Sequence, residues 1–322
     1  MTCHFVDYLF LFYFLFFIFY FLFYFIALAN DVNIHLEQGM QLLMKGQLNE
    51  ALSHYHQAVE SDPKNFLTYF KRSTVFQAMG RYKQALDDLR SSLELNSEFV
   101  PARLQKAIVL YRQGALDEAH IDFESILRRN PHHEEATNYY TQIDTMKDHM
   151  VFLEGLIRAE DWPMAIDYMN RLIPELFLCY RLKELRAEAY EKVHDYINAV
   201  INYRSLTKMR SDNTVAYLKL SKLHYILGEP EESLMAIREC LKLDSDHKEC
   251  HEHYKKVKKV ANFYKVANEA ASASDFEKCS DRLRSALKLE NSENQIVHLI
   301  KSKLCHCLNN VSYFNLFFVI SI

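Results

Sequence analysis

Three glycines near the start of the chain recur at a constant interval. Gly46, Gly80 and Gly114 are 34 residues apart, and an alanine follows each of them by five residues. Asp62-Pro63 and Asn130-Pro131 end the first and third of these segments. A fixed period of this length is typical of repeat proteins, in which each repeat is one small structural motif. Each segment therefore predicts a helix, a glycine turn and a second helix that ends at a helix breaker.

The composition favours helices and argues against one class of partner. The 322 residues include only six glycines and six prolines, which disfavours an all-β fold with many tight turns. We therefore expect an all-α superhelical solenoid. The formal net charge is −4 and there is no basic block, so the chain lacks the charge pattern that neutralises a phosphate backbone. We expect no nucleic acid among its partners.

The N-terminal segment has no charged residue from Tyr8 to Ala29, and it ends in the small-x-small pattern Ala27-Leu28-Ala29. Residues 1–29 are therefore interpreted as a cleaved signal peptide. No Lys or Arg precedes the apolar run, and its length of about 20 residues is enough to span a bilayer, so a retained signal anchor is the alternative. A wrongly assigned start is a third explanation. The first two place the remaining chain in the lumen of the secretory pathway if the N-terminus stays cytosolic.

Alignment on the alanine after the turn gives seven units, and every residue at this site is small: Ala51, Ala85, Ala119, Ala165, Ala199, Ser233 and Cys279. A second small site lies in the first helix of most units, at Gly39, Ser73, Ala107, Ala187, Ser221 and Ala267, with Leu153 the exception. Small residues at both sites allow the paired helices to approach closely, while larger side chains fill the space between units.

The intervals between the seven alignment sites are 34, 34, 46, 34, 34 and 46 residues. The extra 12 residues fall in Glu134–Met150 and in Lys248–Phe263, which keep helical apolar spacing without a breaker. Each insertion therefore predicts one long helix that joins two blocks of three repeats. We expect blocks at residues 32–145 and 146–259, an incomplete third block at 260–310, and an uncharged hydrophobic tail at 311–322.

The repeat resembles the tetratricopeptide repeat over about residues 32–305. The grouping in threes behind a signal sequence resembles the endoplasmic-reticulum tetratricopeptide/J-domain co-chaperones, known as inhibitors of the interferon-induced double-stranded-RNA-activated kinase. The resemblance is carried by stretches such as Gly39–Leu43, Tyr82–Leu89 and His194–Ala199. It implies a lumenal protein that binds unfolded or misfolded polypeptides, and it implies stress kinases as partners by the family name alone.

Family members continue into a J domain, which acts on a lumenal Hsp70. This chain departs from the family pattern near Asn309, and no His-Pro-Asp tripeptide, on which that action depends, occurs in it. We therefore expect a truncated relative that binds client without stimulating ATP hydrolysis by Hsp70. No phosphate loop, nucleophile elbow or zinc-protease motif is present, so we expect neither an enzyme nor a cofactor.

The inward-facing offsets of the first helices predict a client-binding groove in the first block. Its residues are apolar: Leu36, Met40, Leu43, Met44, Leu67, Phe70, Leu104, Ile108 and Tyr111. Exposed apolar surface usually marks a binding site, and flexible Met side chains suit many partners. Burial of some of these residues by neighbouring helices is the alternative. Tetratricopeptide proteins that hold the C-terminal carboxylate of Hsp70 or Hsp90 carry Lys and Asn at two of these offsets. Leu36 and Met40 occupy them here, so we expect no carboxylate clamp.

The same offsets in the second block are charged and mostly acidic, with Glu184, Glu188 and Glu191 among them. This surface supports an alternative function, in which an anchored adaptor assembles specific folded partners. A pull-down that yields one stoichiometric partner would favour the adaptor over a binder of many unfolded chains.

Two cysteines lie ten residues apart across a helix–helix turn, and the family resemblance implies a disulfide between them, Cys240 and Cys250. Two buried free thiols are the alternative. Cys305 lacks its usual family partner, and a bond to Cys307 would be strained. The cluster His247, Cys250, His251 and His253 invites a zinc interpretation. On a helix His251 and His253 point to different faces, and no second cysteine pair flanks the cluster, so we expect no metal there. Asn310-Val311-Ser312 has the pattern of a glycosylation acceptor, which matters only if the tail is lumenal.

Overall fold

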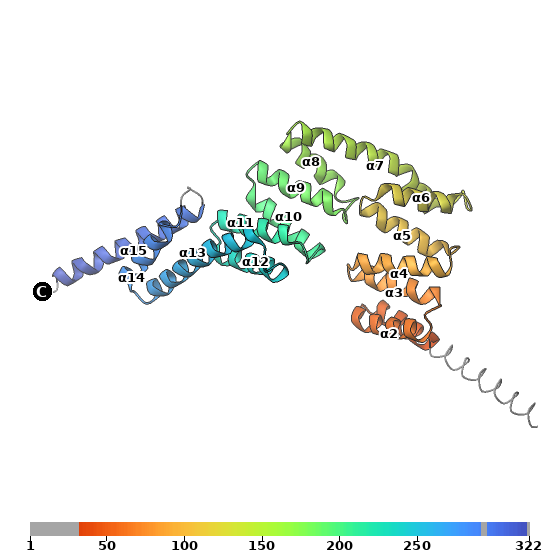
Figure 1. Cartoon of the computed structure of the whole chain (residues 1–322), viewed down its shortest axis with the longest axis horizontal. Coiled ribbons are helices and arrows are strands. Elements are labelled where there is room, and N and C mark those ends of the chain that lie inside the picture. The colour runs from red at the N-terminus through yellow and green to blue at the C-terminus, as the bar shows by residue number, and fades with distance from the viewer. Residues whose placement is uncertain (1–31, 291–294, 321–322) are drawn as a thin grey trace, which may run out of the picture. The chain divides into compact units, whose positions relative to one another are not determined.

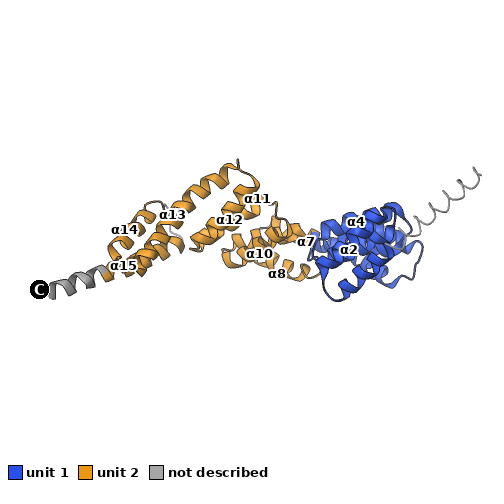
Figure 2. Ribbon diagram, turned by 90° about the horizontal axis from the view of Figure 1, so that it is seen from below, with its two compact units in different colours: residues 1–150, 176–178 blue, residues 151–175, 179–322 orange. Residues whose placement is uncertain are grey.

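The regular structure of the chain is helical throughout the part that the structure describes, which is residues 32–290 and 295–320 of a computed structural model (Figure 1). The expected all-α repeat architecture is confirmed. The chain forms two compact units, the first made of residues up to 150 together with 176–178, and the second of residues 151–175 and 179 onward (Figure 2).

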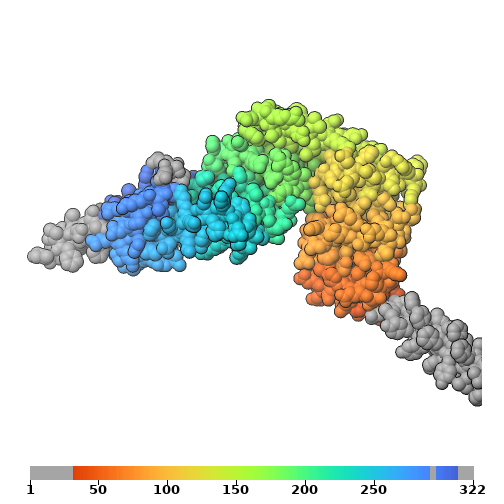
Figure 3. Space-filling view, in the orientation of Figure 1, coloured from red at the N-terminus to blue at the C-terminus, as the bar shows by residue number. Residues whose placement is uncertain are grey.

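The first unit consists of consecutive antiparallel helix pairs that pack on one another. Figure 3 shows its side chains, from orange to yellow, as a continuous packed body. Its elements are a helix over residues 32–44, α2 (Leu48–Ser61), α3 (Phe66–Ala78), α4 (Tyr82–Leu95), α5 (Val100–Arg112), α6 (Leu116–Leu127) and the first part of α7 (Glu134–Arg158).

The second unit continues the same arrangement from the end of α7. Its remaining elements are α8 (Trp162–Leu172), α9 (Tyr180–Lys192), α10 (Tyr196–Met209), α11 (Thr214–Ile226), α12 (Pro230–Leu243), α13 (Lys248–Ser272), α14 (Phe276–Leu287) and α15 (Gln295–Ile320). Helices α7 and α13 are each 25 residues long and uninterrupted, which confirms the two long helices predicted from the 12-residue insertions.

The small residues of the alignment sites lie at the contact between paired helices. All seven of them, from Ala51 to Cys279, have an exposed fraction of 0%. Gly39, at the second small site of the first repeat, shows why size matters, because a Cβ atom there would lie 2.9 Å from ring carbons of Tyr55. A larger residue at position 39 would therefore require the buried Tyr55 ring, or the helix that carries it, to shift.

A residue with a left-handed backbone stands at the turn of every repeat. Glycine occupies it at Gly46, Gly80, Gly114 and Gly228, where φ is between 73° and 80°. This conformation allows the last carbonyl groups of the first helix to accept hydrogen bonds from the turn. In the second repeat, for example, the N–H groups of Gly80 and Arg81 donate to the carbonyl oxygens of Gln77 and Phe76.

Three turns adopt the same backbone without glycine. Glu160, His194 and Ser274 have φ of 55°, 59° and 60°, in a region that is unfavourable for residues with a Cβ atom. An aspartate follows each of them and caps the next helix. For example, Asp275 accepts a hydrogen bond from the N–H of Lys278 at 3.1 Å. Asp161 and Asp195 do the same for Met164 and Asn198.

The residues that follow the glycine turns make no side-chain capping bond: Gln47, Arg81, Ala115 and Glu229. An N-cap aspartate stabilises a helix by about 1 kcal/mol relative to alanine. The cap thus offsets part of the backbone strain in the three repeats whose turn is not glycine.

A side-chain pair sixteen residues apart joins the two helices of several repeats. Arg72 on α3 makes two hydrogen bonds to Asp88 on α4, at 2.8 and 2.7 Å, in a largely buried position. The equivalent pairs differ in chemistry: Lys106–Asp122 is an ion pair at 2.9 Å, Phe152–Tyr168 a ring contact at 4.9 Å, and Arg186–Asn202 a hydrogen bond at 2.9 Å.

The connection between α8 and α9 has a contact that the repeat pattern does not predict. Its residues 176–178 belong to the first unit. The N–H of Leu178 donates to the carbonyl oxygen of Arg112 at 3.1 Å, and the Arg112 guanidinium lies 5.2 Å from the centre of the Phe177 ring. The Phe177 ring also approaches Tyr82, at 6.3 Å.

Among the described helices, none has both the length and the apolar character needed to cross a membrane. The expected signal peptide or anchor at residues 1–29 lies outside the described residues, and so do positions 321–322 of the expected hydrophobic tail. The backbone of α15 continues as one helix to Ile320.

The turn conformation gives a matched pair of stability predictions. We expect Ser274→Gly to raise the free energy of unfolding by about 0.5–1 kcal/mol, because glycine adopts a φ of 60° without steric cost. Gly80→Ala should lower it by about 1 kcal/mol through the backbone alone, since no atom lies within 4 Å of the added Cβ. Urea unfolding of each variant measures both changes. A destabilised Ser274→Gly protein would contradict this account of the turn.

Candidate binding surface in the first unit

The first two repeats expose large apolar side chains at the predicted groove positions. Met44 is 82% exposed, and Met40 and Leu67 are each 38% exposed. Met40 and Met44 lie one turn apart on the helix over residues 32–44, and Leu67 lies in the first turn of α3. These three side chains and the half-buried Leu36, Leu43 and Phe70 are called the apolar surface below.

Leu36 and Leu43 also take part in the core of the first unit. They pack against the buried cluster that includes Tyr55, Val75 and Phe76. Only part of each side chain is therefore available to a ligand. Their packing fixes the face of the helix on which Met40 and Met44 lie, because residues three and four apart share one helix face.

The third repeat does not extend this surface, which corrects the predicted groove. Leu104, Ile108 and Tyr111 on α5 are 8%, 4% and 1% exposed. The ring of Tyr111 lies 5.1 Å from that of Tyr139 on α7, and its hydroxyl donates to Gln142, also on α7, at 3.5 Å. The long helix α7 thus covers the position that the repeat pattern leaves open at Tyr111.

Aromatic side chains next to the apolar surface were missed by the sequence reasoning. The ring of Phe70 lies 5.1 Å from that of Phe99, and Phe66 lies 4.8 Å from the same ring, both in edge-to-face contact. All three rings are half-buried. Phe99 precedes α5 and therefore has no helix offset, so a search along helix faces does not find it.

Arg72 lies two residues after Phe70 on α3, and its ion pair with Asp88 on α4 holds the two helices together. Hydrogen bonding to Asp88 raises the pKa of the Arg72 guanidinium. Arg72 also contacts the His56 ring nitrogen of the preceding repeat at 3.0 Å, and burial, followed by the positive charge of Arg72, lowers the pKa of His56. His56 therefore stays neutral near pH 7 and links the first repeat to the second.

The acidic positions of the second unit are mostly paired within the protein. Glu184 forms an ion pair with Arg181 at 2.8 Å, and Glu191 forms one with Lys219 at 3.1 Å. Glu191 also accepts a hydrogen bond from the Tyr203 hydroxyl at 2.5 Å. Burial and this hydrogen bond raise the pKa of Tyr203. These carboxylates are therefore less available to a basic partner than the sequence suggests.

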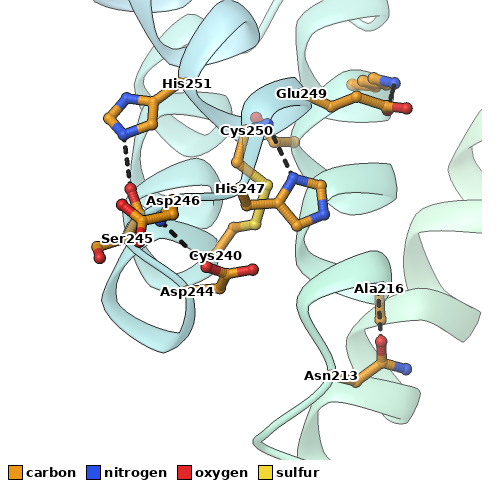
Figure 4. Close-up of a disulfide and its surroundings, with 12 residues drawn as sticks. Asn213, Ala216, Cys240, Asp244, Ser245, Asp246, His247, Glu249, Cys250 and His251 are labelled. Atoms are coloured by element: carbon orange, nitrogen blue, oxygen red, sulfur yellow. Dashed lines mark hydrogen bonds and ion pairs between the residues drawn. A yellow bond between two sulfur atoms is a disulfide. The ribbon is translucent and has the colours of Figure 1, made fainter.

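The first disulfide joins the end of α12 to the start of α13, as the family resemblance implied. The Cys240 and Cys250 sulfurs are bonded, and their Cα atoms are 6.4 Å apart (Figure 4). Both side chains are fully buried and belong to a cluster with Leu218 and Ile237.

A second disulfide, between Cys279 on α14 and Cys307 on α15, was not predicted. Cys279 was interpreted only as the small residue of its alignment site, and Cys307 was considered only as a strained partner of Cys305. In the structure Cys305 is an exposed free thiol, as expected for a residue without its usual partner.

The candidate glycosylation residue Asn310 lies inside helix α15. Its side-chain amide donates to the carbonyl oxygen of His306 at 2.8 Å. Acceptor asparagines of this type are expected in surface loops, so this position is unfavourable for the modification.

Comparisons with known proteins agree with this architecture. The tetratricopeptide repeat family matches residues 70–134, and the family described as anaphase-promoting complex subunit 5 matches residues 177–255. DnaJ homolog subfamily C member 3 from Bos taurus is 38% identical over 283 residues, which is 87% of this chain and 56% of the bovine protein. The human protein of the same name is 38% identical over 282 residues, with the same two coverages.

The crystal structure of the P58(IPK) TPR domain has a TM-score of 0.76 and 38% sequence identity to this chain, covering 87% of this chain and 79% of that domain. The chain belongs to the P58(IPK) family. A more distant relative, at 28% identity over 69% of this chain and 42% of its own length, is the tetratricopeptide repeat and J domain-containing co-chaperone DNJ1 of Fusarium oxysporum. The P58(IPK)-family chain described here spans little more than half the length of the DnaJ subfamily C relatives that it matches.

The two disulfides give a prediction about stability. Cys279 and Cys307 are 28 residues apart in the sequence, and Cys240 and Cys250 are ten residues apart. By the chain-entropy relation, the longer loop should stabilise by about 3.5 kcal/mol and the shorter by about 2.5 kcal/mol. We therefore expect the double substitution Cys279→Ala/Cys307→Ala to lower the unfolding midpoint more than Cys240→Ala/Cys250→Ala does.

Thermal unfolding of the two oxidised variants measures this difference. Alanine is used because all four positions are fully buried and serine would leave a buried hydroxyl group. Mass spectrometry of a non-reduced digest of the unsubstituted chain is the control. Free thiols at Cys279 and Cys307 in that digest, or equal shifts in the two variants, would contradict the prediction.

Proposed function

We propose that this chain binds unfolded or misfolded polypeptides through the apolar surface of its first unit. The observation that carries the proposal is the exposure of Met40, Met44 and Leu67 on two successive repeats. Exposed apolar side chains on neighbouring elements commonly mark interaction sites, and unbranched methionines adapt to ligands of different shape. Such a surface suits a binder of many apolar segments rather than of one fixed partner.

The family relationship supports a co-chaperone role. The fungal relative is named a co-chaperone, and the mammalian relatives are named as DnaJ homologs. We propose the same kind of role for this chain, by binding rather than by catalysis. The chain spans 56% of the bovine relative. We therefore propose cooperation with a lumenal Hsp70, and stress kinases as partners, for the full-length relative.

We further propose the lumen of the endoplasmic reticulum as the location. The two disulfides support it, since each joins cysteines that are fully buried, and such bonds persist mainly in oxidising compartments. The apolar, uncharged run from Tyr8 to Ala29 supports it as well. The adaptor alternative gains less support, because Glu184 and Glu191 are paired with basic residues of the same unit.

The proposal predicts that charge on the apolar surface weakens client binding. We expect the double substitution Met40→Glu/Phe70→Glu to weaken suppression of aggregation of a denatured protein by about tenfold or more, which corresponds to about 1.4 kcal/mol of lost binding free energy. Light scattering against increasing amounts of each variant measures the change. The matched control is Ile121→Glu, since Ile121 is 64% exposed on α6 and lies outside the apolar surface.

A third variant separates binding from folding. Phe70 packs against Phe99, so its replacement by Glu perturbs the repeat as well as the surface. Met44 is 82% exposed, and Met44→Glu should leave circular dichroism and the unfolding midpoint unchanged while still weakening suppression. Full suppression by both apolar-surface variants, or an equal loss in Ile121→Glu, would show that this surface does not bind clients.

A further inference from the structure

Three groups with metal-binding chemistry converge at the turn between α12 and α13. The Cys240 and Cys250 sulfur atoms and a ring nitrogen of His247 all lie within 4.8 Å of one another. Cys240 comes from the last turn of α12, His247 is the N-cap residue of α13, and Cys250 lies in the first turn of α13. Figure 4 shows the His247 side chain directly beside the bonded sulfurs.

This ligand set suits zinc once the sulfurs are not bonded to each other. Zn²⁺ binds cysteine thiolates at about 2.3 Å and imidazole nitrogens at about 2.0–2.1 Å in tetrahedral sites. Two thiolates and one imidazole fill three positions and leave the fourth for water. We propose that the reduced chain binds one Zn²⁺ through Cys240, Cys250 and His247, so that the same turn is closed either by a disulfide or by a metal ion.

Conversion of the disulfide to the zinc site takes two steps, reduction of the disulfide and binding of Zn²⁺. From the disulfide, a thiol or phosphine reductant supplies two electrons, the bond between the Cys240 and Cys250 sulfurs breaks, and each sulfur takes up one proton. Zn²⁺ then forms two bonds to sulfur and one to a His247 nitrogen, and the two thiol protons leave to solvent. A newly made chain whose cysteines have not yet been oxidised needs no reduction and binds Zn²⁺ directly.

The position of His247 is already fixed by the fold. Its Nδ1 accepts a hydrogen bond from the N–H of Cys250 at 3.3 Å, which holds the ring at the start of α13 and next to that cysteine. The neighbouring His251 is held differently, because its ring contacts the carbonyl oxygen of Ser245 at 2.7 Å on the other side of the turn (Figure 4). His247 is therefore the histidine that can complete the site.

The sequence analysis grouped His247 with Cys250, His251 and His253 and expected no metal. It placed Cys240 beside Cys250 across the turn Leu243–His247 only as a disulfide partner, and did not count Cys240 as a metal ligand. The proposed site lies in the second unit and does not depend on the proposed client binding, which concerns residues of the first unit.

Cobalt(II) titration of the full chain tests the proposal. The chain carrying Cys279→Ala/Cys307→Ala is reduced with a phosphine under anaerobic conditions, so that the second cysteine pair cannot contribute. We expect the absorption bands of tetrahedral cobalt thiolate coordination, saturation at about one ion per chain, and displacement by Zn²⁺. The oxidised form of the same protein should show no such bands.

Two matched substitutions decide the ligand set. His247→Asn keeps a side-chain acceptor at the N-cap position but removes the imidazole, so helix α13 should persist while zinc affinity falls by about tenfold or more. His251→Asn, four residues on, should leave the affinity unchanged. Circular dichroism confirms that both variants fold. Absence of stoichiometric binding in the reduced chain, or equal affinity of the His247→Asn variant and the unsubstituted site, would overturn the proposal.

Discussion

The close approach of two helices within each repeat is the constraint on which the rest of the structure depends. At the alignment site of every repeat the exposed fraction is zero, and at Gly39 even one additional carbon atom would collide with Tyr55. Close packing at these positions fixes the distance between helices, and hence which side chains of the first helix remain outside. The exposure of Met40 and Met44 is a consequence of this packing, because their helix is fixed by Leu36 and Leu43.

The turns show how the repeats keep one geometry with different residues. The backbone conformation is the same at Gly46 and at Ser274, but only the serine carries steric strain. The aspartate that follows Ser274 caps the next helix, and the glutamine that follows Gly46 does not. Strain at the end of one helix is thus offset at the start of the next, within two residues of chain.

The period of the sequence was enough to predict the helices, the turns and the long helices α7 and α13, because small residues recur at fixed offsets and glycine occupies four of the seven turns. It could not predict the burial of Tyr111, which depends on where Tyr139 of a long helix lies in space. Nor could it predict the bond between Cys279 and Cys307, since a small buried residue and a bonded cysteine satisfy the same packing position. Features set by one repeat alone were predictable, and features set by contacts outside the repeat pattern were not.

The side-chain pairs that join the two helices of several repeats bear on the fidelity of folding. Seven similar helix pairs in one chain could exchange partners, which is a characteristic failure of repeat proteins. If α3 paired with α8 instead of α4, Arg72 would meet the ring of Tyr168, and Asp88 would lose the partner that it has in the native pair. Breaking a buried ion pair costs about 3–5 kcal/mol, enough to disfavour the exchanged arrangement. The different chemistry of these two pairs therefore disfavours an exchange of helices between the second and the fourth repeats.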